Sequence, residues 1–213
     1  MKKLLVITLI ITLSVGLRGL LFHNDLIGAF PEGVDRIQIE NHVVEGSVRF
    51  FMSKAHADLL FKEYEQSSVA DLDKTQSLTH VENAIAELQQ SIDNYQNAAD
   101  TGARIGYHQA RRQWFTSFDF GKFSDEHKLN RGIADEVSAY LSKGDIVGVY
   151  RRNIDLLNQI AATLRQIRDT LKKGDTPSVS LLWTLVRQYS ETLLFGNYTT
   201  MMGTTVLGIH NQN

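Results

Sequence analysis

Residues 145–174 read DIVGVYRRNIDLLNQIAATLRQIRDTLKKG, with apolar residues recurring at intervals of three and four. This spacing is typical of an amphipathic α-helix that packs one face against a core. Asp145 is placed to cap the helix N-terminus, and Lys172-Lys173-Gly174 is a typical C-terminal stop. The face that we expect to be buried comprises Val149, Leu156, Leu157, Ile160, Leu164, Ile167 and Leu171.

A second long helix is predicted directly downstream, because Thr176 can cap it and Pro177 suits its first position. We expect this helix to end near Met202. The turn between the two helices is only a few residues long, so they must pack antiparallel as neighbours. The stripe of the second helix that suits the core comprises Val179, Leu182, Val186, Tyr189, Leu193 and Met201.

Three more apolar residues of this helix, Leu181, Leu185 and Phe195, point away from that stripe. A monomeric four-helix bundle has no use for a second apolar face, so something must cover it. The short helix predicted below or the N-terminal segment would bury it within the chain. Another chain would instead make it a partner or self-association interface, and the sequence leaves both covers open.

Upstream, the pattern predicts two further long helices and one short helix. The first starts near residue 44, with a core stripe formed by Val44, Val48, Phe51, Ala55 and Leu59. The second runs from a capping box made by Thr79 and Glu82 to about residue 116. The short helix covers residues 125–142, with Ser124 as its expected N-cap. Residues 20–43 read as irregular, and the alternation over residues 36–40 suggests a short extended piece.

These elements predict an all-α fold, an antiparallel four-helix bundle with one extra short helix, over residues 44–213. Before the bundle, Met1-Lys2-Lys3 is followed by an apolar run from Leu4 to Val15 and a small residue at Gly16. This is the layout of a secretory signal peptide over residues 1–19. It predicts a periplasmic or secreted protein. The alternative is an uncleaved anchor, the one case in which we expect membrane contact.

The composition excludes several kinds of chemistry. The chain has 213 residues, a formal net charge of −2 and no cysteine, so thiolate metal sites and cysteine nucleophiles are ruled out. The charge gives no reason to expect nucleic acid. Nucleophile-elbow, phosphate-loop and paired-histidine motifs are missing. We therefore expect no enzyme activity, no cofactor and no metal. His56 is either a boundary histidine or an axial haem ligand, and the first interpretation is preferred.

The best candidate site in the sequence is a group of cations on one helix face. Arg104, His108, Arg111 and Arg112 lie within about 100° of each other on a helix, and Trp114 follows. Clustered guanidinium groups can hold a carboxylate or a sulfate. The alternative is an ordinary solvated face. The sequence thus predicts a possible small anionic ligand.

Two functions remain open at this point. The first is a non-enzymatic extracytoplasmic bundle that acts in protein–protein interaction or assembly, through Leu181, Leu185 and Phe195. The second is a small-ligand or cofactor-binding bundle of the sensor kind. Missing catalytic motifs and the second apolar face favour the first function.

Overall fold

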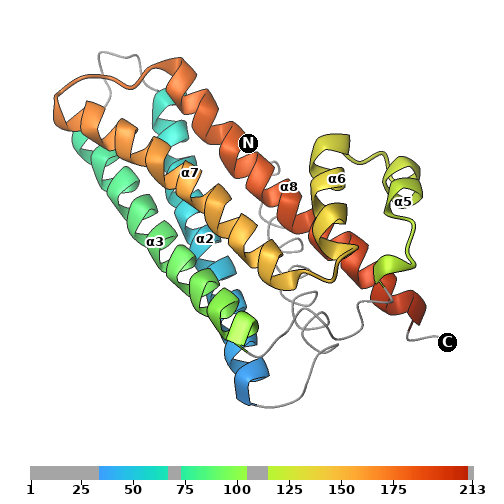
Figure 1. Cartoon of the computed structure of the whole chain (residues 1–213). Coiled ribbons are helices and arrows are strands. Elements are labelled where there is room, and N and C mark those ends of the chain that lie inside the picture. The colour runs from blue at the N-terminus through green and yellow to red at the C-terminus, as the bar shows by residue number, and fades with distance from the viewer. Residues whose placement is uncertain (1–33, 67–72, 105–114, 211–213) are drawn as a thin grey trace, which may run out of the picture.

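The computed structural model describes residues 34–66, 73–104 and 115–210, and these residues form an all-α fold (Figure 1). The four long helices are α2 (Val34–Gln66), α3 (Lys74–Arg104), α7 (Ile146–Lys172) and α8 (Val179–His210). Two short helices, α5 (Phe120–Glu126) and α6 (Arg131–Leu141), lie between α3 and α7 in the sequence. The predicted all-α helical bundle is confirmed.

The long helices run alternately up and down the bundle (Figure 1). Helix α3 packs between α2 and α7, and α7 also packs against α8. The short helix α6 lies against the C-terminal half of α8 and near the start of α7 (Figure 1). The molecule therefore has a four-helix body and, at one end, a small α5–α6 unit that covers the side of α8.

Helix α7 follows the sequence prediction. The Asp145 carboxylate accepts a hydrogen bond from the backbone N–H of Gly148 at 2.8 Å, which is the expected N-cap. The helix ends at Lys172 with Lys173 as its C-cap, and Gly174 adopts a φ of +81°, a conformation that favours glycine. Leu156, Ile160 and Leu164 are all buried. A strictly one-sided apolar pattern was enough to fix this helix, its ends and its core face.

The predicted core face of α2 was wrong. The buried positions are Ile39, Val43, Phe50, Ala57 and Leu60, with the small residues Gly46 and Ser53 between them. The expected stripe lies on the opposite side of the helix, where Val48 and Leu59 are exposed. Both sides of α2 carry apolar residues at helical spacing, so hydrophobicity alone does not choose between them. The small residues decide, because only their side of the helix allows α3 to come close.

Close approach is visible along the whole α2–α3 seam. Ser53 Oγ donates a hydrogen bond to the carbonyl of Ala84 at 2.8 Å, and Ser91 Oγ donates to the carbonyl of Gly46 at 2.7 Å. A Cβ added at Gly46 would lie only 3.1 Å from the buried Tyr95 ring. Backbone and side chain of facing helices therefore bond directly, which satisfies buried hydroxyls without water.

The starts of α2 and α3 differ from the prediction. Helix α2 begins at Val34, so the extended piece expected over residues 36–40 is helical, and the irregular segment does not extend to residue 43. Helix α3 begins at Lys74, because the carboxylate of Asp73 accepts hydrogen bonds from the backbone N–H groups of Thr75 and Gln76, both at 3.0 Å. Thr79 lies inside α3 and donates to the carbonyl of Thr75. Asp73 thus replaces the predicted capping box, six residues before Thr79.

The short helix predicted over residues 125–142 is two helices. Asp119 caps α5 and Asn130 caps α6. Ser124, the expected N-cap, is buried within α5 and donates to the carbonyl of Phe120. Lys128 between the helices has a φ of +51°, which no α-helix accepts, so the chain must turn there.

Helix α8 also differs at both ends. Its N-terminal N–H groups are met by Ser178, whose hydroxyl accepts from Leu181 N–H at 3.2 Å, so Thr176 is not the cap. The helix continues past Met202 to His210, although Gly203 lies within it. Gly203 is buried, which indicates that packing offsets the lower helix propensity of glycine.

The second apolar face of α8 is covered by the chain itself. Leu185 and Phe195 are fully buried, and Leu181 is half-buried against the core. The ring of Tyr140 on α6 meets Phe195 edge to face, with centroids 6.4 Å apart. The interface predicted at Leu181, Leu185 and Phe195 is therefore not open to a partner. The short helix α6, one of the covers that the sequence left open, packs on α8 at Phe195.

Candidate functional site

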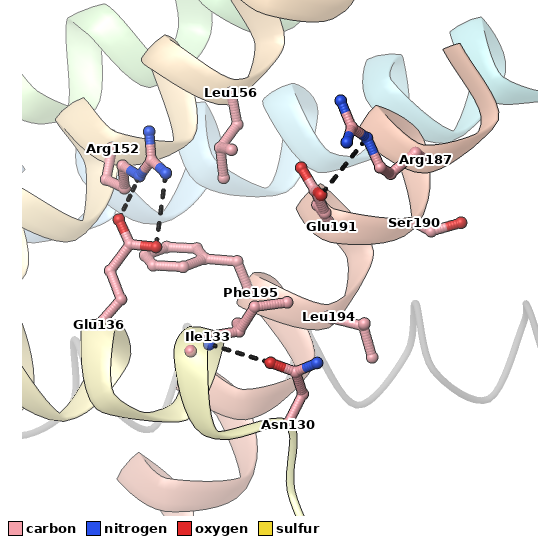
Figure 2. A pocket seen from close by; sticks show the side chains of 11 residues that line it. Asn130, Ile133, Glu136, Arg152, Leu156, Arg187, Ser190, Glu191, Leu194 and Phe195 are labelled. Atoms are coloured by element: carbon pink, nitrogen blue, oxygen red, sulfur yellow. Dashed lines mark hydrogen bonds and ion pairs between the residues drawn. The ribbon is translucent and has the colours of Figure 1, made fainter. Parts of the chain in front are cut away.

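A pocket of about 380 Å³ lies where α6, α7 and α8 meet (Figure 2). Its volume falls at the small end of the range found for ligand sites. Helix α6 contributes its first turns, α7 its N-terminal third and α8 its middle. The lining residues are Asn130, Gly132, Ile133, Glu136, Arg152, Leu156, Arg187, Ser190, Glu191, Leu194 and Phe195.

One wall of the pocket is an ion pair that joins α7 to α6. Arg152 Nε lies 2.5 Å from Glu136 Oε1, and a second guanidinium nitrogen lies 3.4 Å from Oε2. The two side chains are 25% and 34% exposed. Each guanidinium contact thus has its own carboxylate oxygen, an arrangement that adds directional strength. This pair positions α6 against α7.

The other charged pair lies within α8. Arg187 Nε and Glu191 Oε1 are 3.8 Å apart, one helical turn from each other. That distance is too long for a hydrogen bond. Arg187 is 71% and Glu191 44% exposed, so solvent screens their attraction. In Figure 2 this pair is separate from the Arg152–Glu136 pair, with Leu156 between the two in this view.

Apolar side chains complete the pocket. Leu156 and Phe195 are buried, while Ile133 and Leu194 are half-buried and pack against the core. Figure 2 shows the Phe195 ring beside the Arg152–Glu136 pair. The pocket therefore presents an apolar surface with charges of both signs at its edges. This combination suits a small molecule with an apolar body and polar groups, because few polar contacts are enough to orient such a ligand.

The corner between α6 and α7 holds these groups in place. Tyr140, near the end of α6, contacts Phe195. Its ring also lies close to Gly148 of α7, where an added Cβ would be only 2.8 Å from the ring. Burial first, and then the charge of Glu136, raises the pKa of the Tyr140 hydroxyl. Tyr140 therefore stays neutral at physiological pH and acts here as a packing residue.

The cation cluster predicted from the sequence is described only at its first member. Arg104 lies at the end of α3 and is exposed, and one of its guanidinium nitrogens is 2.6 Å from the Asp35 carboxylate on α2. His108, Arg111, Arg112 and Trp114 lie outside the described residues. Anion binding by this cluster stays a prediction.

A second polar cluster lies between the end of α2 and the start of α3. His80 Nε2 is 3.2 Å from Glu63 Oε1, and Glu63 Oε2 accepts a hydrogen bond from Ser77 Oγ at 2.7 Å. The rings of His56 and His80 have centroids 6.4 Å apart. Burial, and then Glu63, raises the pKa of the nearby Tyr64 to about 12. Within the part of the chain that the structure describes, no group of three or more His, Asp or Glu is arranged to hold a metal ion.

The outer side of α8 carries exposed apolar residues near its start. Val179 is 69% exposed and Trp183, one turn later, is 67% exposed. Val179 and Met201 of the predicted core stripe are therefore exposed, which corrects that prediction at both ends of the stripe. Leu182 and Tyr189 of the same stripe are buried, as is Leu185. A tryptophan with this exposure offers a large contact area to any molecule that packs there.

Comparison with known proteins finds no matching family model, no matching curated protein and no matching solved structure. None of the described helices is both long and apolar enough to cross a membrane.

The pocket could not be recognised from the sequence. Its charged residues come from three helices. Arg187 and Glu191 have the spacing of an ordinary surface pair on one helix, and Arg152 and Glu136 lie 16 residues apart on two helices. The one available signal is in α8, where Arg187 and Glu191 are the only charged residues between 179 and 209. Two charges isolated on an otherwise uncharged helix suggest a specific environment, and that environment is the rim of the pocket.

Proposed function

We propose that this protein is a non-enzymatic helical-bundle binding protein that takes a small organic molecule in the α6–α7–α8 pocket. We further propose that it acts outside the cytoplasm, in the periplasm or as a secreted protein. The observation that carries the first proposal is the pocket, with apolar side chains beneath charges of both signs. The N-terminal signal-like sequence supports the second.

Geometry favours this function over an interface at the predicted residues. Leu185 and Phe195 are buried, and Phe195, which meets Tyr140 of α6, forms part of the pocket beside α6. The α5–α6 unit thus gives the bundle a concave site that four long helices alone would lack. A site between a bundle and an added unit is a common position for ligands, because side chains from several elements converge there.

Filling the pocket tests the proposal. Leu194 lines the pocket from a half-buried position, whereas its neighbour Leu193 is equally half-buried but does not line it. Leu194→Trp should abolish ligand stabilisation, and the matched control Leu193→Trp should retain it. The ligand set comprises amino acids, organic acids, amines, sugars and nucleosides at about 10 mM, a concentration that detects sub-millimolar binding by mass action.

A ligand at about one hundred times its Kd stabilises the folded state by about 2.7 kcal/mol. For a chain of this size, that corresponds to a rise in Tm of about 5–10 °C. If no compound raises the Tm, or if the rise survives in Leu194→Trp, the pocket is not the binding site and the proposal fails.

Protein–protein interaction or assembly is the second candidate function, and the exposed pair Val179 and Trp183 favours it. Tryptophan is enriched among residues that dominate binding energy at interfaces. Trp183→Ser should leave folding intact, because the side chain is mostly exposed. It should abolish any concentration-dependent association seen by sedimentation velocity. A wild-type protein that remains monomeric, and recovers no partner from its native compartment, would remove this candidate.

Export is tested separately. Intact-mass measurement of the protein isolated from its natural source should show an N-terminus between about residues 17 and 20. A species that retains Met1 would favour the uncleaved anchor.

A further inference from the structure

The two ion pairs at the pocket differ in whether their partners are hydrogen-bonded to each other. Arg152 and Glu136 are joined by two contacts, at 2.5 and 3.4 Å, and hold α7 to α6. Arg187 and Glu191 face each other at 3.8 Å, beyond hydrogen-bond distance. The first pair is therefore part of the framework. The second pair is open, with a guanidinium fork and a carboxylate that can each bind a ligand group.

We propose that the ligand class of this pocket is a zwitterion with an apolar side chain, such as a free α-amino acid. This inference rests on the proposed ligand-binding function. The ligand carboxylate would bind the guanidinium of Arg187, whose fork matches carboxylate geometry. The ligand ammonium would bind the carboxylate of Glu191. The apolar side chain would lie on Leu194, Ile133 and the buried residues beneath them.

Charge balance argues against ligands of a single charge. An organic anion on Arg187 would lie next to the carboxylate of Glu191, because the two side chains are 3.8 Å apart. An organic cation on Glu191 would likewise meet Arg187. A zwitterion is the arrangement that satisfies both groups, since its opposite charges are also close to each other. Like charges placed together would instead reduce affinity.

Size and polarity agree with this class. The volume of about 380 Å³ is small for a ligand site, which fits a molecule of amino-acid size better than a nucleotide or a lipid. The half-buried Ile133 and Leu194 offer an apolar surface for a branched or aromatic side chain, with the buried Leu156 and Phe195 also lining the pocket. Both charged groups are at the exposed rim, so the ligand can enter with its apolar end first.

The experiment removes one ligand charge at a time. Isothermal titration calorimetry on the full chain uses L-leucine and L-phenylalanine, each with its N-acetyl derivative and its amide. The N-acetyl derivative lacks the ammonium and the amide lacks the carboxylate. At least one of the two amino acids should bind, and both of its derivatives should bind about tenfold more weakly, because each has lost a charge-assisted contact.

Two protein variants test the same contacts from the other side. Arg187→Gln should weaken the amino acid about tenfold but leave the amide, which lacks the carboxylate, unchanged. Glu191→Gln should likewise weaken the amino acid about tenfold but leave the N-acetyl derivative, which lacks the ammonium, unchanged. Lys122 and Glu126 on α5 form a matched control, since they are also one turn apart at 3.8 Å and are not part of the pocket. Glu126→Gln should bind every ligand as the wild type does.

Equal affinity for an amino acid and either derivative would overturn the inference, and so would the absence of binding by both amino acids. These results are distinct from failure of the proposed function. A different compound whose stabilisation is abolished by Leu194→Trp would uphold the pocket as a binding site while refuting the zwitterion. Both substituted side chains are largely solvent-facing, and circular dichroism spectra confirm that each variant is folded.

Discussion

Replacing Gly148 with alanine is expected to destabilise the protein through the cap of its own helix. A Cβ at this position would lie 2.3 Å from Asp145 Oδ2 and 2.8 Å from the Tyr140 ring, well inside contact distance. The Asp145 carboxylate must therefore leave the position in which its other oxygen accepts the Gly148 N–H, at 2.8 Å. The substitution should thus remove the N-cap of α7 without changing the capping residue.

The magnitude follows from three contributions. Losing an N-cap costs about 0.5–2 kcal/mol. Crowding against Tyr140 costs about 1–3 kcal/mol, as for other overpacked sites. Alanine returns at most about 1 kcal/mol of helix propensity. We expect Gly148→Ala to lower the free energy of unfolding by about 2 kcal/mol, whereas Asp145→Ala alone should lower it by about 1 kcal/mol.

A double-mutant cycle separates this mechanism from simple crowding. In the Asp145→Ala background the cap is already lost and the nearest clash is gone, so Gly148→Ala should cost about 1 kcal/mol less than in the wild type. Urea unfolding followed by far-UV circular dichroism measures all four proteins, with an unchanged m-value expected. Gly196→Ala on α8 is the control, since its added Cβ meets nothing within 4 Å and should be neutral or stabilising. Additivity of the two changes to within about 0.3 kcal/mol would refute the reasoning.

Three further predictions concern the core. Ile160→Ala should cost about 2–5 kcal/mol by urea unfolding because Ile160 is fully buried, whereas the exposed Arg165→Ala should stay within about 0.5 kcal/mol. Ser53→Ala should lower the free energy of unfolding by about 1–3 kcal/mol, because the buried Tyr189 hydroxyl loses its partner at 2.7 Å. This loss should exceed that of Tyr189→Phe, and the reverse order would contradict the Ser53–Tyr189 hydrogen bond. The contribution of Tyr64 to stability should be constant below about pH 10, the ordinary pKa of tyrosine, and should be lost towards pH 12, because the folded state holds the Tyr64 proton up to about pH 12. Burial also raises the pKa of Tyr150 and Tyr189, so Tyr64→Phe should make the alkaline decline shallower without abolishing it. An unchanged slope would show that Tyr64 does not contribute.

The sequence predicted an all-α bundle, and for α7 it also predicted the ends and the core face. Helix α7 has apolar residues on one side, so its core face could be assigned correctly. Helix α2 could not be assigned in this way, because Val48 and Leu59 compete with Val43 and Leu60 on its other side. The choice depended on small residues that carry little hydrophobicity but allow a neighbour to approach.

The sequence missed the capping residues Asp73, Asp119 and Ser178, and it did not predict the contacts between helices that are distant in the chain. Leu185 and Phe195 suggested an interface because the sequence does not show that α6 folds back over α8. The pocket that α6 forms there joins Arg152 and Glu136, which are 16 residues apart, to Arg187 and Glu191 on a third helix. Helical periodicity gives the direction of each side chain around its own axis. Periodicity does not show which side chains of other helices each residue contacts.

The α2–α3 seam has a consequence for how sequences of this fold can diverge. At Gly46, Ser53 and Ser91, hydroxyls and backbone carbonyls of facing helices bond directly, so a larger side chain would push the helices apart. Along α8, by contrast, large residues such as Tyr189 and Phe195 fill the space between helices. Substitutions among Leu, Ile, Met and Phe can exchange volume there at modest cost. Evolutionary drift should therefore change the bulky residues of α8 freely, while the positions that stay fixed longest should be the smallest ones, on α2 and α3.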